Sequence, residues 1–201
     1  MTDVRGQAAN NPPAPGVSPG SGPGAAQRAP EEAGQAAGMT RPTEAAPAPR
    51  PTGTVLTTRE IQGLIPHRWP FLLVDRIVEY DPEHQRIVGQ KAVTATEWYF
   101  QGHFPAQPVM PGVLQIEALA QTMAVYVAKQ PGFGDTMGLF AGIEECKFRR
   151  IVLPGDTLRL EVTMEKLGRR FGKGRAVASV DGEVACEALL SFIIPPPGAL
   201  R

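Results

Sequence analysis

The residue of this sequence that most needs a chemical explanation is Glu117, a carboxylate set among apolar residues. It lies in the run VLQIEALAQTMAVYVAK, residues 113–129, and its neighbours at helical spacings of three and four are Val113, Leu114, Ala120 and Gln121. A charged carboxylate is costly in such surroundings, so it must be hydrogen-bonded, paired or protonated. A local donor or a solvent-facing helix edge would also satisfy it, so Glu117 alone does not establish a site.

His103 is the second candidate, in the segment Gly102-His103-Phe104-Pro105 just ahead of that run. Loops held on a rigid scaffold often carry function, and histidine titrates near neutral pH, so His103 can act as a base. The other histidines have plainer explanations. His84 is expected to be solvated in a polar turn, and His67, next to Pro66, to cap or pack locally.

The third candidate feature is Met110-Pro111-Gly112-Val113, at the expected start of the helix. The first N–H groups of a helix lack internal partners, and the helix dipole favours negative charge there. Because Gly112 has no side chain, a substrate oxygen can approach its backbone closely. Such an N–H donor to an oxyanion is worth about 3–4 kcal/mol. The Pro-Gly pair can equally serve only to begin the helix.

Together these groups offer a base, an acid and an oxyanion donor. They suit proton abstraction next to a carbonyl with loss of a neighbouring hydroxyl. His103 would take a proton from C2 of a thioester, and Glu117 would protonate the departing hydroxyl. This chemistry requires no metal and no other cofactor.

The elements that must position these groups follow from hydrophobic patterns and turn signals. Thr57 and Glu60 have capping-box spacing, which predicts a short helix ending near Leu64. Residues 113–129 contain no Gly or Pro and predict a long buried helix. Strands are predicted over 71–80, 86–95, 137–148, 157–166, 175–180 and 184–194, the last two joined by a hairpin at Asp181-Gly182. The fold class is therefore α+β, with one antiparallel sheet of about six strands wrapped around a long central helix.

Composition limits the functions that this chain can have. Residues 1–52 are rich in Ala, Pro and Gly and are predicted to form a disordered tail, followed by a single domain over 53–201. Lys+Arg and Asp+Glu are both 20, which argues against a nucleic-acid partner. No apolar run is long enough to span a bilayer, so no membrane association is expected. Cys146 and Cys186 lack metal-ligand spacing and could form one disulfide or stay as two free thiols; we expect free thiols in a reducing compartment.

Three motifs, in order along the chain, resemble those of the (3R)-3-hydroxyacyl-(acyl-carrier-protein) dehydratases of type II fatty-acid synthesis. The first is LIPHRWPFLLVDR at 64–76, the second runs from QGHFP at 101–105 through PVMPGVL at 108–114 to Gln121, and the third is KFRR at 147–150 followed by PGD at 154–156. The resemblance covers residues 56–195. Thr96 to Phe100 and Ile151 depart from the family's usual pattern without touching the candidate catalytic residues.

The resemblance implies a hot-dog fold and a homodimer in which His103 of one subunit faces Glu117 of the other, with three dimers commonly forming a hexamer. It implies dehydration of a 3-hydroxyacyl-acyl carrier protein to the trans-2-enoyl product, with His103 and Glu117 catalytic and Gly112 and Val113 binding the substrate. The cytoplasm is the expected compartment, with a plastid as the alternative. Related bifunctional dehydratase-isomerases carry Asp in place of Glu117, so isomerisation is not expected.

Two further sets of residues have open interpretations. Tyr99 and Phe100 could line or gate an acyl tunnel or could simply pack in the core. Lys147, Arg149 and Arg150 could dock an acidic carrier protein or form a solvated strand end. The basic residues between Arg169 and Arg175 are expected in a flexible Gly-rich loop. The rival functions are a thioesterase and a catalytically silent acyl-binding subunit, although the latter usually loses one of the two catalytic residues.

Overall fold

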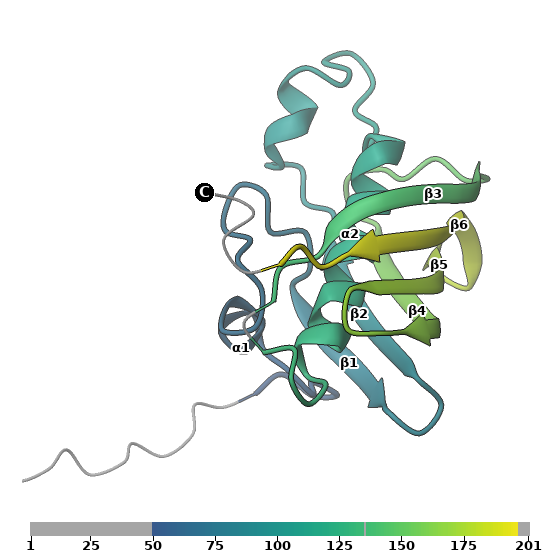
Figure 1. The fold of residues 1–201 in the computed structure, drawn as a ribbon. Coiled ribbons are helices and arrows are strands. Elements are labelled where there is room, and N and C mark those ends of the chain that lie inside the picture. Colours follow the sequence, from purple (N-terminus) through teal and green to yellow (C-terminus); the bar gives the residue numbers. More distant parts are fainter. Residues whose placement is uncertain (1–49, 135, 197–201) are drawn as a thin grey trace, which may run out of the picture. The chain divides into compact units, whose positions relative to one another are not determined.

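The structure, a computed structural model, describes residues 50–134 and 136–196. Residues 1–49, most of the predicted tail, lie outside the described residues. The described part contains six strands and one long helix, in the order shown in Figure 1. The strands are β1 (Arg76–Asp81), β2 (Arg86–Ala92), β3 (Leu139–Phe148), β4 (Thr157–Leu167), β5 (Phe171–Val180) and β6 (Glu183–Ile193). The helices are α1 (Thr58–Gln62), the 3-10 helix η1 (Trp98–Gln101) and α2 (Gly112–Ala128).

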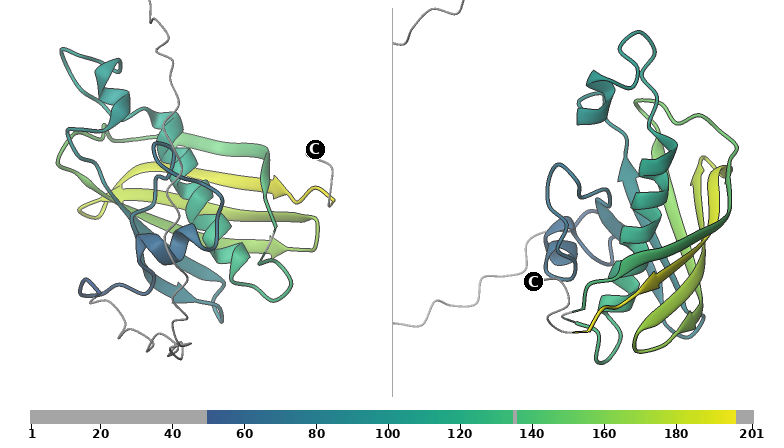
Figure 2. Two further views of the ribbon diagram at one scale, coloured as in Figure 1. Left: turned by 90° about the vertical axis from the view of Figure 1, so that its left-hand side faces the viewer. Right: turned by 45° about the horizontal axis from the view of Figure 1, so that its top comes forward.

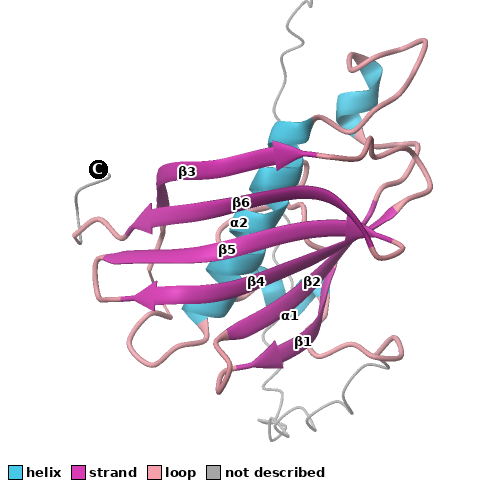
Figure 3. Ribbon diagram, turned by 90° about the vertical axis from the view of Figure 1, so that its right-hand side faces the viewer, coloured by secondary structure: helices cyan, strands magenta, loops and turns pink. Residues whose placement is uncertain are grey.

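The strands form one antiparallel sheet in the order β1-β2-β4-β5-β6-β3 (Figure 3). The sheet curves around α2, which crosses its concave face (Figure 2). This arrangement confirms the predicted α+β class and the hot-dog fold implied by the resemblance. No helix in the described ranges is both long and apolar enough to cross a membrane.

Alternate side chains of the central strands pack against α2. On β4 these are Leu158, Leu160, Val162 and Met164, all buried, while their neighbours along the strand are more exposed. The helix also approaches β2 closely, since a Cβ built on Gly89 would lie only 2.9 Å from Oγ1 of Thr122. A side chain at residue 89 would therefore push α2 away from the sheet.

Several local predictions are confirmed. Thr57 is the N-cap of α1, its side chain accepts from the Glu60 N–H, and the Glu60 carboxylate accepts from the Thr57 N–H. Asp181 and Gly182 join β5 to β6 with φ angles of 49° and 85°, as a two-residue type I′ hairpin requires. Cys146 and Cys186 are free thiols, and burial raises the pKa of Cys186 to about 12.

Two strand predictions were wrong at their start. β1 begins at Arg76 rather than residue 71, because the backbone of Phe71 and Leu73 bonds to the Gln121 side chain instead of to a strand. β5 begins at Phe171, so the predicted flexible loop around Arg175 is largely strand. Lys173 there pairs with Glu144, at 2.9 Å between the ammonium nitrogen and the carboxylate oxygen, and Arg175 pairs with Glu145 at 3.4 Å.

Candidate active site

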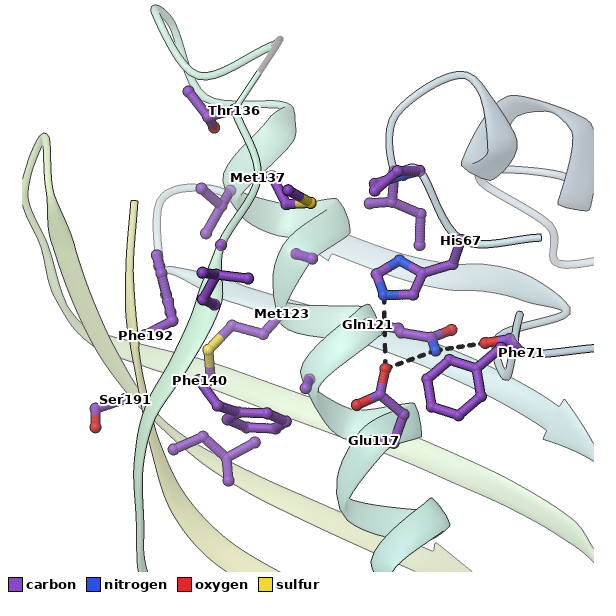
Figure 4. Close-up of a pocket in the computed structure, with 18 residues that line it drawn as sticks. His67, Phe71, Glu117, Gln121, Met123, Thr136, Met137, Phe140, Ser191 and Phe192 are labelled. Atoms are coloured by element: carbon purple, nitrogen blue, oxygen red, sulfur yellow. Dashed lines mark hydrogen bonds and ion pairs between the residues drawn. The ribbon is translucent and has the colours of Figure 1, made fainter. Parts of the chain in front are cut away.

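Glu117 lies on the side of α2 that faces an apolar cavity of about 300 Å³. Its side chain is 18% exposed, and its polar neighbours in the cavity wall are His67 and Gln121 (Figure 4). The rest of the wall is mainly apolar. It includes Met123 and Val127 from α2, Met137 just before β3 and Phe140 on β3. The cavity thus has one polar end around a carboxylate and a long apolar remainder.

Gln121 fixes the position of Glu117. One turn further along α2, its Nε2 donates to Oε1 of Glu117 at 2.9 Å and to the Phe71 carbonyl at 2.7 Å. Its Oε1 accepts from the Leu73 N–H at 2.8 Å. Because the Gln121 amide is tied at both ends to the backbone before β1, it holds the carboxylate in one orientation. The expectation that Glu117 must be hydrogen-bonded or paired is confirmed.

His67 is a site residue that sequence reasoning missed. Its Nε2 lies 3.6 Å from Oε1 of Glu117, and its buried Nδ1 has no partner among the described residues. Burial lowers the pKa of the imidazole more than the charge of Glu117 raises it. His67 is therefore neutral at neutral pH. The only available signal was its place in the motif at 64–76, because no local pattern relates residue 67 to residue 117.

His103 lies in the loop between η1 and α2 and is held by that loop's own backbone. Its N–H donates to the Tyr99 carbonyl at 2.9 Å, and its carbonyl accepts from the Val109 N–H at 3.2 Å. The ring stacks on Phe104 at 4.0 Å between centroids, and Nδ1 lies 2.8 Å from the Val109 carbonyl oxygen. The peptide bond between His103 and Phe104 is cis.

The bond to Val109 determines which nitrogen of His103 can act as a base. A carbonyl oxygen only accepts, so Nδ1 must carry the hydrogen. In the neutral imidazole this leaves the lone pair on Nε2, which has no hydrogen-bond partner among the described residues. His103 is therefore in the tautomer that a general base needs, with its reactive nitrogen free.

The loop is anchored on both sides of His103, to β2 on one side and to the β3–β4 connection on the other. Before η1, Lys91 of β2 is buried and pairs with the carboxylate of Glu97. After it, the Met110 N–H donates to the Val152 carbonyl at 2.9 Å. A buried ion pair broken on one side is strongly destabilising, so the Lys91–Glu97 pair holds the start of η1 in place.

The start of α2 presents unpartnered donors. The N–H groups of Gly112 and Val113 form no hydrogen bond within the described part of the chain, as expected for a first helical turn. A Cβ on Gly112 would lie 2.7–3.0 Å from the Phe148 ring, so packing also requires a glycine here. The side chain of Val113 is 71% exposed.

One chain does not bring all of these residues together. Glu117 lines the cavity, but His103, Gly112, Val113, Tyr99 and Phe100 are not among its lining residues. Tyr99 and Phe100 are 4% and 8% exposed and belong to the hydrophobic core. The loop carrying His103 projects beyond the beginning of α2 (Figure 1). No described hydrogen bond or ion pair joins His103 to Glu117.

The basic residues at the end of β3 are mostly neutralised. Arg149 pairs with Glu187 at 2.5 Å, and Arg150 pairs with Asp156 at 2.8 Å and with Glu183 at 3.1 Å. The bond from Arg150 lowers the pKa of the Asp156 carboxyl, which remains ionised. Lys147 has no ion pair among residues 50–134 and 136–196. Of these three basic residues it is therefore the one whose positive charge is not neutralised by a carboxylate.

Sequence relatives of this chain carry the name of a dehydratase. The 3-hydroxyacyl-(acyl-carrier-protein) dehydratase FabZ of Chloroflexus aggregans is 56% identical over 143 residues, 71% of this chain and 99% of the relative. The enzyme of the same name from Bacillus pumilus is 56% identical over 142 residues, 71% of this chain and 98% of the relative.

A solved structure shares the fold. The dehydratase heterocomplex ApeI:P from Xenorhabdus doucetiae matches with a TM-score of 0.59 at 19% identity, covering 70% of this chain and 93% of that one. The FabA-like domain family matches residues 65–189, which include both His103 and Glu117. This chain belongs to the FabA-like family.

Proposed function

We propose that this chain is a 3-hydroxyacyl-(acyl-carrier-protein) dehydratase, which removes water from a (3R)-3-hydroxyacyl thioester to give the trans-2-enoyl thioester. The similarity to enzymes of that name over more than two thirds of the chain supports this activity. Two observations carry the proposal: a half-buried carboxyl, Glu117, lies at the end of an apolar cavity, and the same chain supplies a histidine whose Nε2 lone pair is free.

In the proposed reaction, Nε2 of His103 takes the proton from C2 of the substrate. Glu117 gives a proton to the hydroxyl on C3, which leaves as water while the C2–C3 double bond forms. The free N–H groups of Gly112 and Val113 would stabilise the negative charge that develops on the thioester oxygen. The apolar cavity beyond Glu117 would hold the acyl chain, and no metal or other cofactor takes part.

We propose that the complete site needs a second copy of the chain. All of β3 except Gly142 is exposed, although this edge strand carries Leu139, Phe140, Ile143 and Phe148. A long apolar edge left open invites aggregation, so it must be covered. Pairing of two β3 strands would cover it and bring His103 of each copy toward Glu117 of the other. A hexamer built from three such dimers, and a cytoplasmic location, stay predictions.

The direct test of the activity is a dehydration assay with a matched hydrolysis control. The purified protein would be given (3R)-3-hydroxydecanoyl-acyl carrier protein and, separately, decanoyl-acyl carrier protein, which has no hydroxyl to lose. We expect enoyl product from the first and no free acid from the second. Hydrolysis of the saturated thioester without enoyl formation would favour a thioesterase, and no reaction with either would favour a silent acyl-binding subunit.

We propose that the basic rim docks the acidic carrier protein chiefly through Lys147, because Arg149 and Arg150 are already paired. We expect Lys147→Glu to raise KM for the carrier-bound substrate by about threefold to tenfold, most strongly at low salt. With the same acyl group on pantetheine alone, KM should not change.

Lys166→Glu, an equal charge reversal on β4, is the control for this prediction. If Lys147→Glu affects both substrates alike, or if the control has the same effect, then Lys147 does not dock the carrier protein.

A further inference from the structure

The cavity follows α2 for most of the helix length. The residues of α2 that line it are Glu117, Ala120, Gln121, Met123, Ala124 and Val127. Glu117 and Val127 are ten residues apart, which is about 15 Å along the helix axis. The small side chains of Ala120 and Ala124 leave room along this stripe. The cavity is therefore long and narrow, with the carboxyl of Glu117 at one end.

Phe192 lines this cavity away from Glu117 (Figure 4). It lies on β6 between its register partners Phe140 of β3 and Gly172 of β5. Its side chain is 8% exposed and packs in the hydrophobic core. Phe192 is thus a fixed part of the wall rather than a mobile surface group.

The ring of Phe192 occupies the space above Gly172. A Cβ built on Gly172 would lie 2.3 Å from Cζ and 2.5 Å from Cε1 of the ring, far closer than side-chain atoms can approach. Phe192 lines the cavity and Gly172 does not, so the ring separates Gly172 from the cavity. Any side chain at residue 172 must therefore push the ring toward the cavity. The φ of Gly172 is not positive, so alanine there adds a steric effect without backbone strain.

We infer that Phe192, seated on Gly172, is the end wall that sets the longest acyl chain this enzyme accepts. The inference rests on the proposed function, in which the acyl chain enters the cavity past Glu117. An extended chain advances by about 1.25 Å per carbon, given C–C bonds of about 1.5 Å, so 15 Å holds about twelve carbons. Longer chains meet the ring.

The test compares Gly172→Ala and Phe192→Leu with the wild type on 3-hydroxyacyl substrates of four, eight, twelve and sixteen carbons. The wild type should lose activity between twelve and sixteen carbons. Gly172→Ala should lower kcat/KM for the twelve-carbon substrate by about tenfold, because roughly two methylene groups of the chain would no longer be buried. The same variant should leave kcat/KM for the four-carbon substrate unchanged. Phe192→Leu should raise the ratio of sixteen-carbon to eight-carbon activity.

Gly168→Ala is the matched control, since it makes the same change in the β4–β5 hairpin with only an ordinary contact of 3.5 Å to the Phe171 carbonyl oxygen. It should leave the length profile unchanged. Equal losses at all lengths in Gly172→Ala, or an unchanged profile in both Gly172→Ala and Phe192→Leu, would overturn the inference.

A binding measurement separates this inference from the proposed function. Calorimetry with saturated acyl-pantetheine thioethers of the same lengths reports on the cavity without any reaction. Length-dependent binding that Gly172→Ala shortens, in a protein that forms no enoyl product, would uphold the end wall and reject the dehydratase. If the wild type forms enoyl product but neither substitution changes how binding depends on chain length, the dehydratase stands and the end wall is rejected.

Discussion

Replacing His103 with alanine is expected to lower kcat for dehydration by about 10²–10⁴-fold, the usual contribution of a positioned general base. The imidazole is the only group we assign to removing the C2 proton, and its tautomer is fixed by the bond from Nδ1 to the Val109 carbonyl. Because the ring is only partly buried, the variant should keep its fold and oligomeric state. Steady-state assays with the carrier-bound substrate, together with size-exclusion chromatography, measure both effects.

The matched control for this substitution is His84→Ala. His84 lies in the turn after β1, where its ring pairs with Asp81 at 2.7 Å and is largely exposed. Loss of that ring should leave kcat unchanged. If His103→Ala retains more than about a tenth of wild-type activity while remaining folded, another group removes the proton and the assigned role is wrong.

Replacing Glu117 with glutamine is the second change with a large expected effect, again about 10²–10⁴-fold in kcat. Glutamine keeps the size of the side chain and an oxygen that can accept from Nε2 of Gln121, so the cavity should be preserved. It cannot supply the proton that the departing hydroxyl needs. The expected pattern is a large fall in kcat with little change in the affinity for a saturated acyl-pantetheine thioether.

Two further variants sharpen the result for Glu117. Glu187→Gln makes the same change at the surface pair with Arg149 and should leave kcat unchanged. Glu117→Asp keeps the carboxyl group, but its side chain is one methylene shorter and holds the carboxyl closer to the helix. The activity of this variant should therefore lie between those of Glu117→Gln and the wild type. A Glu117→Gln enzyme as active as the wild type would show that the carboxyl does not act as the acid.

Much of the fold could be predicted because its signals are local. The capping box at Thr57 and Glu60 gave the start of α1, and Asp181-Gly182 gave the last hairpin. The start of β1 could not be predicted, because the backbone of Phe71 and Leu73 is hydrogen-bonded to the side chain of Gln121, about fifty residues away. Leu73 and Val74 in that stretch are buried in the hydrophobic core although they lie outside β1.

The site was predictable in its residue types but not in its arrangement. Glu117 was conspicuous as a carboxylate in an apolar helix, and its need for a partner followed from physics alone. Gln121 lies at the helical spacing of four that the sequence indicated, whereas the approach of His67 depends on how the segment before β1 packs against α2. The separation of His103 from the Glu117 cavity within one chain has no sequence signal outside the family resemblance.

The most direct test of the account is complementation between the two inactive variants. His103→Ala and Glu117→Gln chains with different tags would be co-expressed in equal amounts, and mixing would be verified by capture through each tag in turn. If each site combines His103 of one copy with Glu117 of another, about a quarter of the sites receive both intact residues, and dehydration should recover to about a quarter of the wild-type rate. Verified mixing with no activity above that of the separate variants would contradict a shared site.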